Sequence, residues 1–154
     1  MPQITKFDIA YIKMAQEWAN LSYCGRKKVG ALIVKDRMII SDGYNGTPSG
    51  FENCCEDEDG MTHWYVLHAE ANAILKLASS TQSAKGATLY LTLSPCKECS
   101  KLILQAGIKK LVYLDDYSDA EGIHFLKNHE IEVLQLEKNT LFHKEYKTQN
   151  DELE

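Results

Sequence analysis

The sequence predicts an α/β fold: a three-layer α/β/α sandwich around a five-stranded, mostly parallel sheet. Within residues 87–136, apolar runs alternate with helix-like segments, and this β-α-β-α-β order is typical of parallel strands joined by crossover helices. An amphipathic segment near the N-terminus supplies a helix for one face of the sheet. A chain of 154 residues with 44% hydrophobic residues has the size of one domain with its own core.

The first predicted helix follows Thr5, which suits an N-cap. Apolar residues recur in it at steps of three and four, and we expect all of them to be core residues: Phe7, Tyr11, Met14, Trp18 and Leu21. Two strands follow, over residues 29–34 and 37–43, joined by a tight turn at Lys35-Asp36. The first of these strands is nearly all apolar, as expected for a strand covered on both faces.

The second predicted helix, over residues 66–78, is apolar almost all round and is therefore expected to be buried. A third helix over residues 97–106 has Ser94 as its N-cap, Pro95 as its first helical residue and Gly107 as its stop. The remaining elements are strands over 87–93, 108–114 and 131–136 and a helix over 119–128. We expect a domain over residues 1–137 and a polar C-terminal tail over 138–154.

Composition excludes several classes of function. The formal net charge of -5 argues against a dedicated nucleic-acid surface. No apolar run is long enough to span a bilayer, and residues 1–6 contain no secretory apolar segment. The five cysteines are an odd number, which fits a reducing cytoplasm better than a disulfide-rich secreted protein.

Two short stretches supply the ligands of a metal site. His68-Ala69-Glu70 opens the second helix, and Cys96 and Cys99 lie in a P-C-x-x-C segment after a strand. Cys96 and Cys99 share one face of a helix near its positive end, which favours thiolates. His68 and Glu70 would point in nearly opposite directions in mid-helix, so they reach one point only off a helix N-terminus. We therefore expect two helix N-termini to converge on one metal.

The ligand set is that of a catalytic zinc site: His68, Cys96 and Cys99 hold Zn²⁺, and the fourth position is open to water. Zinc lowers the pKa of such a water to about 7, and Glu70 is free to shuttle protons. The alternatives are a structural zinc site or a redox Cys-x-x-Cys. The first would want a fourth protein ligand nearby, and the second leaves His68 and Glu70 unexplained, so the combined signature favours catalysis.

This H-x-E…P-C-x-x-C arrangement resembles the zinc-dependent cytidine/deoxycytidylate deaminase superfamily. Residues 43–50 are similar to the G-Y-N-G-x-P-x-G stretch of its deoxycytidylate (dCMP) deaminase branch. The resemblance implies a cytidine deaminase-like fold and hydrolysis of dCMP to dUMP and ammonia, which supplies dUMP for thymidylate synthesis. It also implies a homo-oligomer, often a hexamer, that dCTP, together with Mg²⁺, activates and dTTP inhibits.

Several residues are candidates for nucleotide binding. Arg26 lies in a short run of cations, which is either a solvated loop or an anion site whose planar guanidinium matches phosphate. Asn45 can donate to and accept from a sugar hydroxyl, and the resemblance implies that it contacts substrate. Gly43, Tyr44 and Gly46 belong to a surface turn or to a loop whose backbone amides hold a substrate or effector phosphate. The choice between a substrate and an effector phosphate for Arg26 stays open.

Two further groups have a structural and a functional interpretation. Tyr117 lies just past a strand, where it is either an exposed tyrosine or an aromatic wall against the pyrimidine ring. Cys24, Cys54, Cys55 and His63 are candidates for a second, structural zinc site, which some relatives carry. Because their spacing matches no standard zinc motif, cysteines packed as small hydrophobic residues are the favoured alternative.

Three other functions compete with dCMP deamination. A tRNA adenosine deaminase shares the zinc motif, but the acidic balance and the loop over residues 45–50 count against it. A free-cytidine deaminase would have no use for phosphate-binding cations. A non-enzymatic, zinc-stabilised interaction module would give Glu70 no structural duty.

Overall fold

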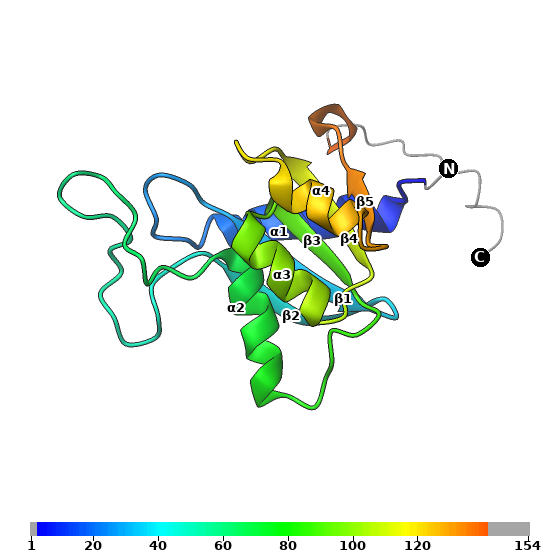
Figure 1. Cartoon of the computed structure of the whole chain (residues 1–154), viewed down its shortest axis with the longest axis horizontal. Helices are drawn as coiled ribbons and strands as arrows, with labels where there is room; N and C mark the ends of the chain where they lie inside the picture. Colours follow the sequence, from blue (N-terminus) through cyan, green and yellow to red (C-terminus); the bar gives the residue numbers. More distant parts are fainter. Residues whose placement is uncertain (1–2, 142–154) are drawn as a thin grey trace.

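The computed structural model describes residues 3–141, which form one five-stranded sheet with helices on both faces (Figure 1). The strand order is β2-β1-β3-β4-β5. The strands are β1 Gly30–Lys35, β2 Met38–Tyr44, β3 Thr88–Leu93, β4 Lys110–Asp115 and β5 Glu132–Gln135. Because β3, β4 and β5 are parallel and β1 is antiparallel to both of its neighbours, four of the five strands point the same way. The predicted α/β fold with a mostly parallel sheet is confirmed.

Helix α1, Lys6–Ala19, covers one face of the sheet. Thr5 caps it as predicted, because its Oγ1 accepts from the Asp8 amide while the Asp8 carboxylate accepts from the Thr5 amide. The predicted apolar stripe is wrong in its phase, since Met14 is 38% and Leu21 50% exposed. The buried residues of the helix include Ile9, Ile12, Ala15 and Ala19. The aromatic residues of the stripe lie at the edge of the buried face.

Helices α2 (Ala69–Lys76), α3 (Lys97–Gln105) and α4 (Glu121–Lys127) lie on the opposite face (Figure 1). A 3₁₀ turn over Leu77–Ser79 extends α2. The prediction that α2 is buried all round is wrong, because Leu75 is 55% exposed. Two apolar clusters, one on each side of the sheet, make the core and confirm the three layers.

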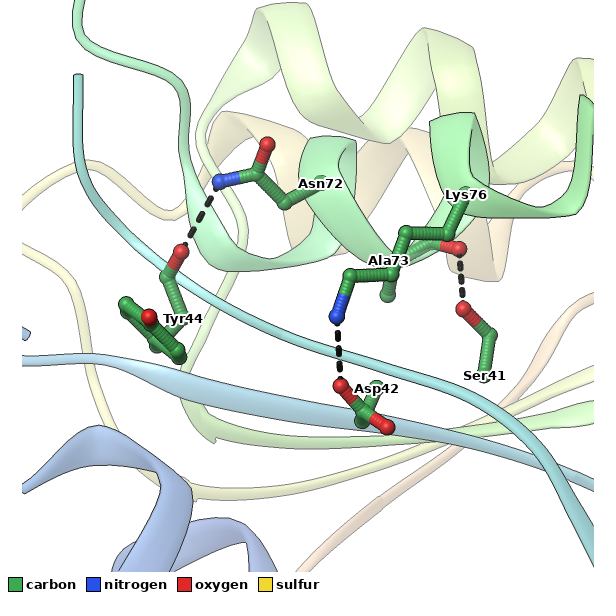
Figure 2. A network of polar contacts seen from close by, with 6 residues as sticks. All are labelled: Ser41, Asp42, Tyr44, Asn72, Ala73 and Lys76. Atoms are coloured by element: carbon green, nitrogen blue, oxygen red, sulfur yellow. Dashed lines mark hydrogen bonds and ion pairs between the residues drawn. The ribbon is translucent and has the colours of Figure 1, made fainter. Parts of the chain in front are cut away.

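Side-chain contacts fasten α2 to the edge strand β2 (Figure 2). The Ser41 hydroxyl donates to the Ala73 carbonyl at 2.6 Å, and the Lys76 ammonium is 2.6 Å from the Asp42 carboxylate. Near the start of the helix, Asn72 Nδ2 donates to the Tyr44 carbonyl at 2.8 Å. These bonds fix the N-terminus of α2 in relation to the carboxyl end of β2.

The C-terminal boundary differs from the prediction. Lys138–Leu141 form a 3₁₀ turn, and Leu141 packs in the apolar cluster on the α1 side of the sheet. The rest of the predicted tail, residues 142–154, lies outside the described residues. Among residues 3–141, no helix has the length and apolar character needed to cross a membrane.

Candidate active site

The structure brings the three predicted metal ligands together. His68 Nδ1 is 3.5 Å from Cys96 Sγ and 3.3 Å from Cys99 Sγ, and the three donor atoms all lie within 4.8 Å of one another. Within residues 3–141, no other three His, Cys, Asp or Glu side chains are grouped in this way. One imidazole and two sulfurs are the donor set that Zn²⁺ takes in catalytic sites with three protein ligands. The residues present therefore fit a zinc ion.

Two helix N-termini position these ligands, as the spacing predicted. His68 is the N-cap of α2, where its backbone is extended and its side chain makes no capping hydrogen bond. Cys96 is the N-cap of α3, and its sulfur accepts from the Cys99 amide. The prediction that Ser94 and Pro95 begin α3 is wrong, because the Cys96 sulfur takes the capping role. Ser94 instead accepts a hydrogen bond from the Tyr117 amide at 2.7 Å.

The two sulfurs differ in acidity. Hydrogen bonds from Cys99 and His68 lower the pKa of Cys96 to about 4. The Cys99 pKa is raised, first by its hydrogen bond to Cys96 and then by burial. The hydrogen bond to Cys96 raises the pKa of His68. Cys96 is thus the thiolate of the pair, and binding of a cation would displace the proton of Cys99.

Glu70 lies beside the ligands but outside the donor set, as predicted. It is the second residue of α2, and only 3% of its surface is exposed. Burial raises the pKa of its carboxyl group above the ordinary value, while the nearby His68 charge acts in the opposite direction. A raised pKa makes the protonated form of this carboxyl group more accessible than that of an exposed glutamate, which suits a group that takes up a proton and passes it on.

His68, Glu70 and Cys96 line a cavity of about 530 Å³. Tyr117 lines the same cavity and is 39% exposed. The cavity lies past the carboxyl ends of β3 and β4, where sites in such sheets are found. Its lining also includes Arg26, Lys27, Val29, Asn45, Glu56, Thr62, Val66, Leu93 and Ser118.

The cations of the 24–28 loop are available to a ligand. Arg26 and Lys27 line the cavity, and Lys28 follows them in an exposed stretch. None of the three side chains forms an ion pair or a hydrogen bond within residues 3–141. Unpaired cations at the mouth of a cavity attract anionic ligands.

The Asn45 side chain forms hydrogen bonds within the protein. Its Oδ1 accepts from the Val29 amide and its Nδ2 donates to the Lys27 carbonyl, each at 2.8 Å. The side chain is 8% exposed and lines the cavity. It therefore braces the loop that carries the cations, a role that the sequence analysis missed.

The predicted phosphate loop has another structure. Gly43 lies in β2, where an added Cβ would be 2.5 Å from the Ala69 carbonyl oxygen, so this glycine permits close packing of α2. The Asn45 amide donates to the Val29 carbonyl, and Gly46 exchanges two backbone hydrogen bonds with Leu67. The backbone carbonyl of Tyr44 is bound by Asn72 (Figure 2). Of the candidate phosphate loop Gly43, Tyr44 and Gly46, the Gly46 amide is not available to a phosphate, because it donates to the Leu67 carbonyl.

The candidate second zinc site is not assembled. Cys24 and Cys55 form a disulfide, so their sulfurs are not metal ligands. Cys54 is exposed, and its thiol contacts the Glu56 carbonyl oxygen at 3.2 Å. The His63 ring stacks on Tyr65 at 4.9 Å between centroids. The favoured alternative, buried cysteines, holds for Cys24 and Cys55, but they are joined in a disulfide that links the loop over residues 24–28 to the excursion over residues 46–67.

Glu56 lines the cavity although the sequence did not mark it as a candidate. Its Oε1 accepts hydrogen bonds from the amides of Gly25 and Arg26, each at 2.9 Å. No spacing rule pairs Glu56 with a loop some 30 residues earlier in the chain. The excursion and the 24–28 loop lie side by side at the left of Figure 1.

Comparison with known proteins agrees with this geometry. Residues 5–115 match the family model of the cytidine and deoxycytidylate deaminase zinc-binding region. The chain is 37% identical to the deoxycytidylate deaminase of Enterobacteria phage T4 over 92% of this chain and 93% of the relative. For the deoxycytidylate deaminase of Mycobacterium phage D29, identity is 38% over 70% of this chain and 93% of the relative.

A solved structure is also similar. The dCMP deaminase of cyanophage S-TIM5, crystallised in complex with dCMP and dUMP, superposes with a TM-score of 0.84 and 46% identity. The match covers 88% of this chain and all of the other. The family model spans most of the chain and includes the three ligands and Glu70. This chain therefore belongs to the cytidine and deoxycytidylate deaminase family.

Proposed function

We propose that this protein hydrolyses dCMP to dUMP and ammonia. The observation that carries the proposal is one cavity lined by His68, Cys96, the buried Glu70 and two cations that are unpaired among residues 3–141. The Cys99 sulfur lies within 4.8 Å of the other two donor atoms and completes the donor set. The relatives that bear the name deoxycytidylate deaminase support this substrate, as does the cyanophage structure with dCMP and dUMP.

Each part of the cavity has a role in this reaction. A zinc ion held by His68, Cys96 and Cys99 would supply a Lewis acid that makes water nucleophilic at neutral pH. Glu70 takes a proton from the water that attacks C4 of the pyrimidine and passes it to N3. It then takes the second proton from the new C4 hydroxyl group and delivers it to the amine, so that the C4–N bond breaks, ammonia leaves and a C4 carbonyl remains. The burial of Glu70 excludes bulk water from these transfers.

The other lining residues bind and orient the nucleotide. Tyr117 lines the cavity, its amide donates to the Ser94 hydroxyl, and its ring stacks against the pyrimidine. Arg26 and Lys27 bind the 5′-phosphate. Asn45 keeps one amide proton and one lone pair beyond its two bonds to the loop, and these are available to a sugar hydroxyl. The proposal gives Arg26 a substrate phosphate.

A free-cytidine deaminase is the second candidate, because the catalytic groups alone would serve it equally well. The unpaired cations favour the nucleotide. Initial rates with deoxycytidine, CMP, dCMP and dCTP, and with an anticodon stem-loop, separate the possibilities. We expect dCMP to have the highest kcat/KM. A higher value for deoxycytidine would refute the assignment of the cations to phosphate binding.

The family resemblance also supports a cytoplasmic homo-oligomer, with a hexamer favoured, that dCTP with Mg²⁺ activates and dTTP inhibits. Light scattering of the purified protein with each nucleotide tests the assembly, and dCMP saturation curves with each nucleotide test the regulation. A monomer with hyperbolic kinetics that neither nucleotide changes would contradict this part of the proposal.

A further inference from the structure

We propose that Glu56 is a specificity-determining residue that restricts the cavity to a nucleoside monophosphate and disfavours a triphosphate. The inference rests on the proposed function, in which the 24–28 loop receives the 5′-phosphate. It concerns a carboxylate that no step of the deamination uses.

The first observation is an anion already bound at the loop. Two successive backbone amides, of Gly25 and Arg26, point at the same Glu56 oxygen at 2.9 Å. Successive amides that converge on one point form a concave anion site of the kind that binds phosphate elsewhere. In this protein the site is filled by the protein's own carboxylate.

The second observation is that one oxygen of the Glu56 carboxylate has no partner and that the group lines the cavity. Glu56 lines the catalytic cavity and is only partly buried. Its Oε2 has no hydrogen-bond partner among residues 3–141, and neither oxygen is paired with Arg26 or Lys27. The negative charge is therefore not neutralised by a cation of the loop, and a ligand in the cavity experiences it.

The charge balance disfavours more than one phosphate. Arg26 and Lys27, which line the cavity, carry two positive charges, and the Glu56 carboxylate reduces their sum to one. A phosphate monoester carries about 1.5 to 2 negative charges at neutral pH, so a monophosphate alone already balances this net positive charge. The further phosphates of a triphosphate would find the amide site occupied and a carboxylate beside it, and like charges repel.

The experiment compares two ligands that do not react. Displacement of a fluorescent dUMP analogue from the zinc-loaded protein gives the Kd of dUMP and of dUTP in magnesium-free buffer. Glu56→Gln removes the charge and keeps an oxygen that can accept from both amides. Glu52→Gln is the matched control, since it removes an exposed carboxylate from the same excursion outside the cavity.

We expect Glu56→Gln to raise the affinity for dUTP relative to dUMP by about tenfold, and Glu52→Gln to leave the ratio within about twofold. A parallel loss of both ligands in Glu56→Gln would show that the residue only braces the loop, and an unchanged ratio would show that its charge is not sensed. Either result overturns the proposal. Turnover of dCMP by the parent protein is measured separately. Failure of the proposed function would appear as absent turnover, whereas failure of this inference would appear in the ratio of the dUTP and dUMP affinities.

Discussion

Gly122 is predicted to be essential to the zinc ligands, although it contacts no metal. It lies in α4, and an added Cβ would be 2.5 Å from the Pro95 carbonyl oxygen, 2.5 Å from Ser100 Oγ and 3.0 Å from the Cys96 carbonyl oxygen. The first two distances are about 0.9 Å short of the 3.4 Å at which ordinary contact begins. Gly122→Ala must therefore push α4 away from the N-terminus of α3, or displace the peptide that positions Cys96.

The loss of stability and of zinc affinity in Gly122→Ala can be bounded from similar substitutions in other proteins. Overpacking a tight contact costs about 1–3 kcal/mol, and for a domain of this size each kcal/mol lowers Tm by about 2–4 °C. Displacing a group that supports a ligand weakens metal binding by about 10–100-fold. Thermal unfolding and competition for zinc with a chromophoric chelator measure the two effects.

Gly46→Ala is the matched control, because a Cβ there meets nothing within 4 Å. We expect it to melt within about 1 °C of the parent and to keep the parent's zinc affinity. The reasoning is refuted if Gly122→Ala melts and binds zinc like the parent, because the contact with the Cys96 peptide would then be of no consequence.

Three further predictions follow from the described contacts. Asn45→Ala leaves the Val29 amide and the Lys27 carbonyl without their buried partner, so it should lower the free energy of unfolding by about 1–3 kcal/mol in urea titration. It should also raise KM for dCMP more than it lowers kcat, and an unchanged KM would argue against a role of Asn45 in bracing the 24–28 loop. Tyr90→Phe removes a 2.6 Å hydrogen bond from the Tyr90 hydroxyl to the buried Asp8 carboxylate and should lower the free energy of unfolding by about 1.5–3 kcal/mol in the same titration. The kcat should not change, because the pair lies on the α1 face of the sheet, and a variant as stable as the parent would contradict a stabilising role for this hydrogen bond. Thiol titration of the denatured, unreduced, metal-stripped protein should find the three free cysteines Cys54, Cys96 and Cys99, and five thiols together with two zinc ions per native chain would instead restore the second zinc site.

The catalytic centre could be predicted from the sequence because its residues lie close together in the chain, within two short motifs. Two residues separate Cys96 from Cys99, and one separates His68 from Glu70, so each pair is constrained by the geometry of a single helix end. The requirement that His68 and Glu70 meet at one point predicted the convergence of two helix N-termini. The cap of α3 was misplaced by two residues because a sulfur acts as the cap, a role usually filled by Ser, Thr, Asp or Asn.

The walls of the cavity could not be predicted in the same way, because they depend on contacts between distant segments. The bond from Glu56 to the amides of Gly25 and Arg26 joins two loops, and no periodicity records it. The 43–50 loop has the composition of a phosphate loop, but the amides of Asn45 and Gly46 bind carbonyl groups of residues that only the fold places nearby. In α1, the period was correct and the phase was wrong, because large aromatic residues cover the rim of the core as well as its centre.

The most direct test of the central claim is conversion of dCMP to dUMP by the zinc-loaded Glu70→Gln protein, followed by the change in ultraviolet absorbance. Glutamine keeps the size of the side chain but cannot carry a proton between water, N3 and the amine. We predict that the variant binds one zinc ion per chain and dUMP like the parent, while kcat falls by at least about 100-fold. Turnover equal to that of the parent, with zinc and fold intact, would contradict the account.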